Sequence, residues 1–84
     1  MRKLNGGAIM KIGEAIKKAM KAERITQAQL AEKVGAKSQS VIAERLKMDN
    51  ISINVIIDML DAVGYEMVIQ PKGNTTEEQL IINK

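Results

Sequence analysis

The sequence predicts an all-α domain of four helices followed by one short β-strand. Apolar residues recur every three or four positions over much of residues 9–63, which is the spacing of helices with one buried face. Two of the expected helices are joined by a tight turn at Gly35. One later run, Tyr65–Gln70, has the composition of a strand. At 84 residues the chain makes one small domain, and residues 8–70 are expected to be its folded part.

The first helix is expected to run from about Ala8 to Glu23. Its apolar stripe consists of Ile9, Ile12, Ile16, Ala19 and Met20. Gly13 lies inside the helix and weakens it locally. Residues 1–7 contain two adjacent glycines and are expected to be a flexible lead.

Residues 25–46 carry the strongest local signals in the chain. Thr26 and Gln29 have the spacing of a capping box at the start of the second helix. Gly35 follows the apolar residues of that helix and suits the left-handed turn that ends it. Ala31 is small enough to let two helices cross closely beside the turn. These signals predict a helix, a tight turn and a further helix.

The spacing T-Q-x-x-L-A-x-x-x-G, which begins at Thr26, resembles that of the phage lambda repressor and Cro family, also called the XRE family. The resemblance covers roughly residues 10 to 64. It implies a four-helix, lambda-repressor-like DNA-binding domain whose third helix lies in the major groove. It also implies a dimer that binds double-stranded DNA at a near-palindromic operator.

The third helix departs from the family pattern, so its register must be chosen. The usual spacing after Gly35 would make Val41 and Glu44 the buried anchors, and a buried Glu is implausible. One additional residue in the turn makes Ile42 and Leu46 the anchors, which lie four apart on one helical face. We prefer this register, in which Ser38 is the N-cap and Gln39 is the first helical residue.

The resemblance also implies which residues contact DNA. Gln27 opens the second helix, where the matching glutamine of the family touches the DNA backbone. Gln39 opens the third helix, where the matching glutamine reads a base, and a Gln amide can pair with N6 and N7 of adenine. The expected outward face around Gln39 consists of Lys37, Ser38, Ser40, Ala43, Glu44 and Lys47, with Arg45 as a further phosphate candidate.

The charge distribution agrees with a DNA-binding surface in the first part of the chain. The net charge is +3. Residues 1–47 contain eleven Lys and Arg against four Glu, whereas residues 48–84 contain two Lys against six acidic residues. Such an asymmetry favours a phosphate-facing surface near the helix-turn-helix.

The fourth helix is expected to run from about Ile53 to Val63, with Ser52 as its cap. One apolar stripe consists of Ile53, Ile56, Ile57, Leu60 and Val63, and a second consists of Val55, Met59 and Ala62. The second stripe faces either a partner subunit or a deeper core, and the sequence leaves both open. Asp58 and Asp61 are expected on a solvated face.

The run Tyr65–Gln70 is expected to pair with the same run of a second copy, because everything before it reads as helix. The dimer contacts would come from Tyr65, Met67, Val68 and Ile69. This resembles the C-terminal strand exchange of antitoxins with the same fold. The alternative is an extended tail, with the fourth helix alone making the dimer. Residues 71–84 are expected to be a disordered tail.

The composition argues against an enzyme and against a metal or cofactor site. The chain has no His and no Cys, which removes zinc ligand sets, disulfides and His-based catalysis. No apolar run approaches the roughly 20 residues of a membrane span, and a cytoplasmic, bacterial or phage-encoded protein is expected. The expected function is a sequence-specific transcriptional repressor. The alternative is the antitoxin of a toxin–antitoxin pair, which represses its own operon and binds a protein toxin.

Overall fold

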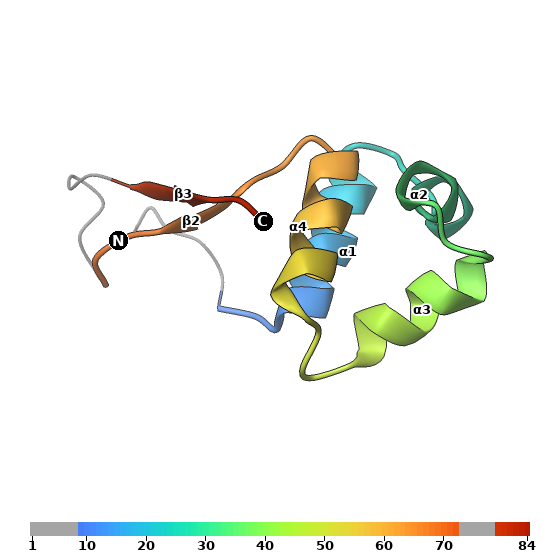
Figure 1. The fold of residues 1–84 in the computed structure, drawn as a ribbon, viewed down its shortest axis with the longest axis horizontal. Helices are drawn as coiled ribbons and strands as arrows, with labels where there is room; N and C mark the ends of the chain where they lie inside the picture. Colours follow the sequence, from blue (N-terminus) through green and yellow to red (C-terminus); the bar gives the residue numbers. More distant parts are fainter. Residues whose placement is uncertain (1–8, 73–78) are drawn as a thin grey trace.

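The computed structural model describes residues 9–72 and 79–84, which form four helices and a two-stranded antiparallel sheet (Figure 1). The helices are α1 (Ile12–Ala22), α2 (Gln27–Val34), α3 (Gln39–Lys47) and α4 (Ile53–Ala62), and the strands are β2 (Met67–Ile69) and β3 (Leu80–Ile82). The expected lead, residues 1–7, lies outside the described residues, as do residues 73–78 of the expected tail. The helices gather into one body, and the two strands extend from one side of it.

Helix α1 is shorter than the sequence predicted, because it begins at Ile12 rather than near Ala8. Lys11 occupies the N-cap position, and its side chain makes no capping hydrogen bond. Ile9 precedes the helix and is fully exposed, at 103%. The prediction that Ile9 belongs to the buried stripe is therefore wrong.

The hydrophobic core lies between the four helices. Its most deeply buried side chains are Ile16 of α1, Leu30 of α2, Ile42 of α3 and Met59 of α4. Met59 comes from the second apolar stripe of α4, and its neighbours Val55 and Ala62 pack against the same core. The second stripe thus serves the domain's own core. Ile53, by contrast, is 49% exposed and does not belong to the buried stripe.

Gly13 of α1 lies close to the backbone of α3. It is buried, and a Cβ atom placed on it would lie 2.0 Å from the carbonyl oxygen of Leu46. A backbone atom held in a helix has little room to move away. Gly13 is therefore required by the packing of α1 against the C-terminal turn of α3, in addition to lowering helix propensity as the sequence indicated.

The strand β2 pairs with β3 of the same chain, which corrects two expectations. The register places Met67 opposite Ile82, Val68 opposite Ile81 and Ile69 opposite Leu80. The premise that β2 has nothing in its own chain to pair with is therefore wrong. The expectation of a disordered tail is also wrong for Leu80–Ile82. The strand is also shorter than the predicted Tyr65–Gln70.

We call β2 and β3 together the arm. One polar contact joins the residues that flank the two strands, and another joins the end of the chain to α4. Gln79 Nε2 donates to Gln70 Oε1 at 2.6 Å, and Lys84 Nζ donates to Asp58 Oδ1 of α4 at 2.6 Å. The hydrogen bond and the charge of Asp58 raise the pKa of Lys84 above its ordinary value. The arm extends away from the helical body (Figure 1), at the side opposite α2 and α3.

Candidate nucleic-acid interface

The α2–α3 unit is built by local interactions that the sequence specified. At the start of α2, the backbone N–H of Gln29 donates to Thr26 Oγ1 at 3.1 Å, and the backbone N–H of Thr26 donates to Gln29 Oε1 at 2.9 Å. At its end, Gly35 has a φ of 74°, in the left-handed region. The N–H of Ala36 donates to the carbonyl of Ala31 at 2.8 Å, which closes the turn. The predicted capping box and glycine turn are both confirmed.

Ala31 of α2 is buried. Its side chain is 4% exposed and belongs to the core, as does the neighbouring Leu30 at 0%. Helices α2 and α3 are in contact. The burial of Ala31 agrees with the sequence argument, and its position at the contact between α2 and α3 stays a prediction.

The register chosen for α3 is also confirmed. Ile42 is completely buried and Leu46 is 5% exposed, whereas Glu44 is exposed. Gln39 is the first helical residue and Ser38 is the N-cap. The Ser38 side chain makes no capping bond, however, and its hydroxyl lies 2.8 Å from that of Ser40. Ser38 caps α3 only through its carbonyl, which accepts from the N–H of Val41 at 3.2 Å.

The polar residues expected to contact DNA lie on the solvent side of this unit. Those that are exposed are Lys37, Ser38, Gln39, Ser40, Glu44 and Lys47. Gln27, Ala43 and Arg45 are half-buried. Gln39, Ala43 and Lys47 succeed one another at intervals of four, so they follow one line along α3. That line begins at the N-terminus of the helix, next to Lys37 in the turn.

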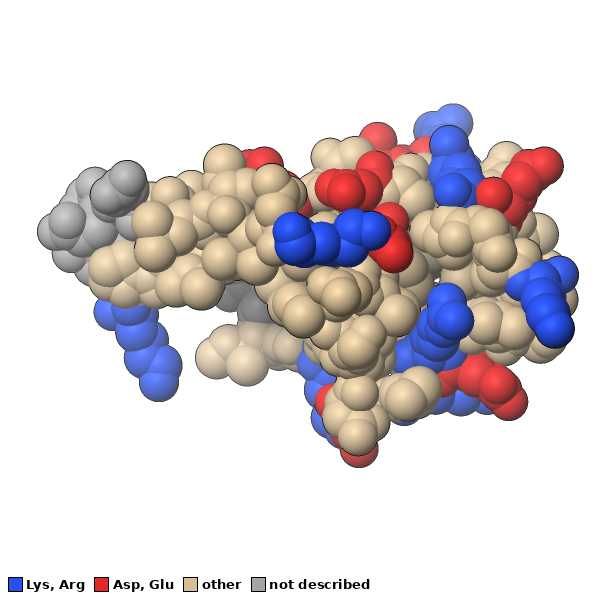
Figure 2. Space-filling view, in the orientation of Figure 1, with Lys and Arg blue, Asp and Glu red and all other residues tan. Residues whose placement is uncertain are grey.

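Basic and acidic side chains both lie on the helical body among the described residues. Figure 2 shows Lys and Arg over the helical body, with acidic side chains between them, and a largely uncharged surface over the arm. Among the residues described, Glu44 takes part in no ion pair, so its carboxylate faces solvent beside the line of Gln39 and Lys47. Any ligand that binds this face of α3 must accommodate the negative charge of Glu44.

An ion pair that the sequence did not reveal lies beside the region that follows α3. Lys11 Nζ lies 3.0 Å from Asp49 Oδ1, so the start of α1 is joined to the loop between α3 and α4. The hydrogen bond to Asp49 and its charge raise the pKa of Lys11. Both side chains are largely exposed, and exposed ion pairs contribute little to stability. No sequence spacing could have indicated this pair, because its partners are 38 positions apart.

The residues expected to form a dimer do not lie in the α2–α3 unit. Tyr65 donates from its hydroxyl to Glu23 Oε2 at 3.4 Å, beside the end of α1. Met67, Val68 and Ile69 form β2, on the side of the body away from α2 and α3. Two separate surfaces therefore carry the two groups of predicted site residues.

No group of three or more His, Cys, Asp or Glu side chains in the described residues could hold a metal ion. None of the helices described is long and apolar enough to cross a membrane.

Comparison with known families agrees with the geometry of α2 and α3. A family model for helix-turn-helix proteins, HTH_3, matches residues 16–69, which span all of α2, α3, α4 and β2. No curated protein and no solved structure matches the chain. The match covers more than half of the sequence. The chain belongs to the XRE-type helix-turn-helix family, the family of lambda repressor and Cro, whose members are DNA-binding transcription regulators.

Proposed function

We propose that this protein is a dimeric repressor that binds a near-palindromic operator and inserts α3 into the major groove. The observation that carries the proposal is the line of Gln39, Ala43 and Lys47 on the solvent side of a helix anchored by Ile42 and Leu46. A helix whose inner face is fixed in the core presents its outer face in a defined orientation. Sequence-specific recognition requires such an orientation, because base edges are read by directed hydrogen bonds.

Each residue on this surface has a role that its chemistry suits. The Gln39 amide has both a donor and an acceptor, and adenine presents the matching pair, N6 and N7, in the major groove. The methyl group of Ala43 suits contact with the methyl group of thymine. Ser38 and Ser40 can donate to phosphate or to a base edge. Lys37 and Lys47 are assigned to phosphates, at the two ends of α3.

Gln27 and Glu44 complete the surface. Gln27 is the first residue of α2, and its side chain is assigned to the DNA backbone. Glu44 would be repelled by phosphate, so its carboxylate is assigned to the amino group of a cytosine, which is a donor. Glu44 therefore restricts which DNA sequences can bind. A sequence with no hydrogen-bond donor facing Glu44 would leave its carboxylate unpaired against the bases.

The proposal includes a dimer because of the reach of one recognition helix. One α3 reaches only one half-site, and members of this motif class bind two half-sites about 34 Å apart, one helical turn along the DNA. Two copies related by a two-fold axis require an operator with matching symmetry.

The arm favours one alternative, that of an antitoxin. Val68, Ile69, Leu80 and Ile81 are all exposed, between 36% and 60%. Apolar residues gathered on a surface mark sites of protein contact, and an antitoxin must hold a protein toxin as well as its operator. Co-purification from the native host separates the two functions. A small protein in stoichiometric amount supports the antitoxin, and its absence supports the repressor.

Selection of bound sequences from random duplex DNA tests the proposed function. We expect an enriched site with two inverted halves whose centres are about 10 base pairs apart. Binding that enriches no sequence would contradict a sequence-specific regulator. Enrichment of a single half-site would instead retain the recognition helix and contradict the dimer.

A further inference from the structure

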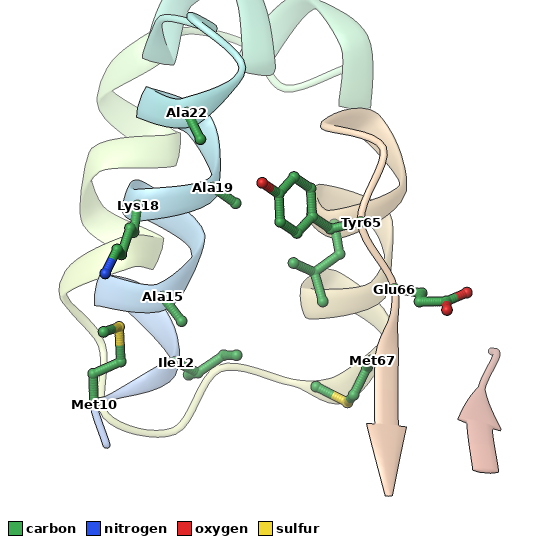
Figure 3. Close-up of a pocket in the computed structure, with 10 residues that line it drawn as sticks. Met10, Ile12, Ala15, Lys18, Ala19, Ala22, Tyr65, Glu66 and Met67 are labelled. Atoms are coloured by element: carbon green, nitrogen blue, oxygen red, sulfur yellow. The ribbon is translucent and has the colours of Figure 1, made fainter. Parts of the chain in front are cut away.

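An apolar groove lies between α1 and the start of β2 (Figure 3). It has a volume of about 440 Å³. Its walls are formed by Ile12, Ala15 and Ala19 of α1, by Leu60 of α4, and by Tyr65 and Met67. In Figure 3, Ala15, Ala19 and Ile12 of α1 face Tyr65 and Met67 across it. Lys18 lies on the α1 side and Glu66 on the β2 side, and in Figure 3 the charged ends of both side chains point away from the groove.

The apolar surface of the groove continues onto one face of the arm. Met67 lines the groove, and residues two apart in a strand share a face, so Ile69 lies on the same face as Met67. Their partners Ile82 and Leu80 share that face as well, because directly paired residues point to the same side of a sheet. Met67 and Ile82 are half-buried at the end nearer the body, whereas Ile69 is 56% and Leu80 52% exposed.

We propose that this groove receives the arm of a second copy of the chain, with Ile69 and Leu80 of each copy seated against α1 of the other. The chain carries both halves of such a contact, an apolar hollow and an apolar projection, next to each other. A two-fold axis makes the contact reciprocal, because a surface that meets itself places each projection in the partner's hollow. The inference rests on the proposed dimeric regulator and names the surface through which it assembles.

The extent of the apolar surface favours a second copy as the occupant. A small apolar ligand would fill the hollow but leave Ile69 and Leu80 in water. A second copy covers the hollow and the projection together.

Cysteine cross-linking between two differently tagged chains tests this directly, because the protein has no cysteine of its own. A protein with Ala15→Cys is mixed with one carrying Ile69→Cys, so that a disulfide between the two can only join separate copies. We expect the mixed disulfide to form readily, since its geometry requires Cβ atoms within about 4.5 Å. The matched control replaces Ile69→Cys by Val68→Cys, on the opposite face of β2, and is expected to give little product.

Sedimentation supplies a second measurement that does not depend on disulfide geometry. Ala15→Glu places a charge in the groove at a half-buried helical position and is expected to dissociate the dimer. Ala28→Glu makes the same change at an exposed position of α2 and is expected to leave the dimer intact.

Three outcomes would overturn the proposal. They are equal cross-linking from both faces of β2, a dimer that tolerates Ala15→Glu, and a wild-type protein that remains monomeric at every concentration. The first two leave the regulator's function standing, because selection of a two-fold symmetric site from random DNA is read independently. A monomer that selects a single half-site would instead indicate another occupant for the groove, such as a small apolar ligand or a different protein.

Discussion

The α2–α3 unit and the arm use their large apolar residues in opposite ways. In α2 and α3 they are buried or half-buried, with Leu30 and Ile42 at 0% exposure. In the arm most of them are exposed, with Ile69 at 56% and Ile81 at 60%, whereas Met67 and Ile82 are half-buried. The apolar residues of the helices therefore pack against one another within a single chain. The arm leaves much of its apolar surface exposed to solvent. The difference shows that the helices are held together by a core within one chain, and we propose that the exposed apolar residues of the arm serve assembly.

This contrast predicts how the two regions respond to substitution. Changes in the helical body should lower its free energy of unfolding. Changes in the arm should act on association, because a two-stranded ribbon contributes little stability by itself in water. The following substitutions are ordered from the largest expected loss of stability to the smallest.

Gly13→Ala is expected to give the largest loss of stability. The new methyl group would lie 2.0 Å from the Leu46 carbonyl oxygen, so α1 and α3 would have to separate, at a cost of about 3 kcal/mol or more. Thermal unfolding followed by circular dichroism measures the loss. Gly35→Ala is the matched control, because its methyl group meets no atom within 4 Å and costs only the left-handed backbone strain of about 1 kcal/mol. Equal losses for the two variants would show that α1 and α3 are not in close contact.

Ala31→Leu is expected to destabilise the domain by about 1–3 kcal/mol, because a larger side chain overpacks the contact between α2 and α3. The measurement is the same unfolding curve, with Ala28→Leu as the control at an exposed position of the same helix. If both variants melted at the wild-type temperature, α2 and α3 would not meet at Ala31.

Val68→Pro is expected to change the stability of the helical body by less than about 0.5 kcal/mol, since it alters an exposed strand outside the core. Its effect should appear in association instead, because proline removes a backbone donor and fits poorly in a paired strand. Melting curves are compared at a concentration where both proteins are monomers, and sedimentation is compared at a higher one. Val68→Thr, which keeps the donor, should behave like the wild type.

Two results would contradict the contrast between the helical body and the arm. A large fall in the melting temperature of monomeric Val68→Pro would mean that arm and body unfold as one unit. A tight dimer in the same variant would mean that the arm plays no part in assembly.

The α2–α3 unit could be predicted from the sequence because its determinants are close together along the chain. The capping box joins residues three apart, and the turn needs one glycine in a left-handed conformation. The register of α3 followed from the four-residue spacing of Ile42 and Leu46 and from the cost of burying Glu44. Local signals of this kind are legible in a single sequence.

The arm could not be predicted in the same way, because its pairing joins residues up to 15 apart, across residues 73–78. Leu80–Ile82 is only three residues long and follows a polar segment, so it carries little signal alone. The available clue was two short apolar runs, 67–69 and 80–82, on either side of Pro71 and Gly73. The role of Gly13 was hidden for a similar reason, since it depends on Leu46, which lies 33 positions away.

Binding titrations of Gln39→Ala test the central claim, that α3 reads base sequence through its first residue. The wild-type protein, Gln39→Ala and Lys47→Ala are each titrated with the selected operator and with single base-pair variants of it, at one salt concentration. We predict that Gln39→Ala loses on the order of 1–3 kcal/mol of discrimination at one base pair in each half-site. Lys47→Ala should weaken binding to all the duplexes alike. A Gln39→Ala protein with the wild-type order of preference among the duplexes would contradict the account.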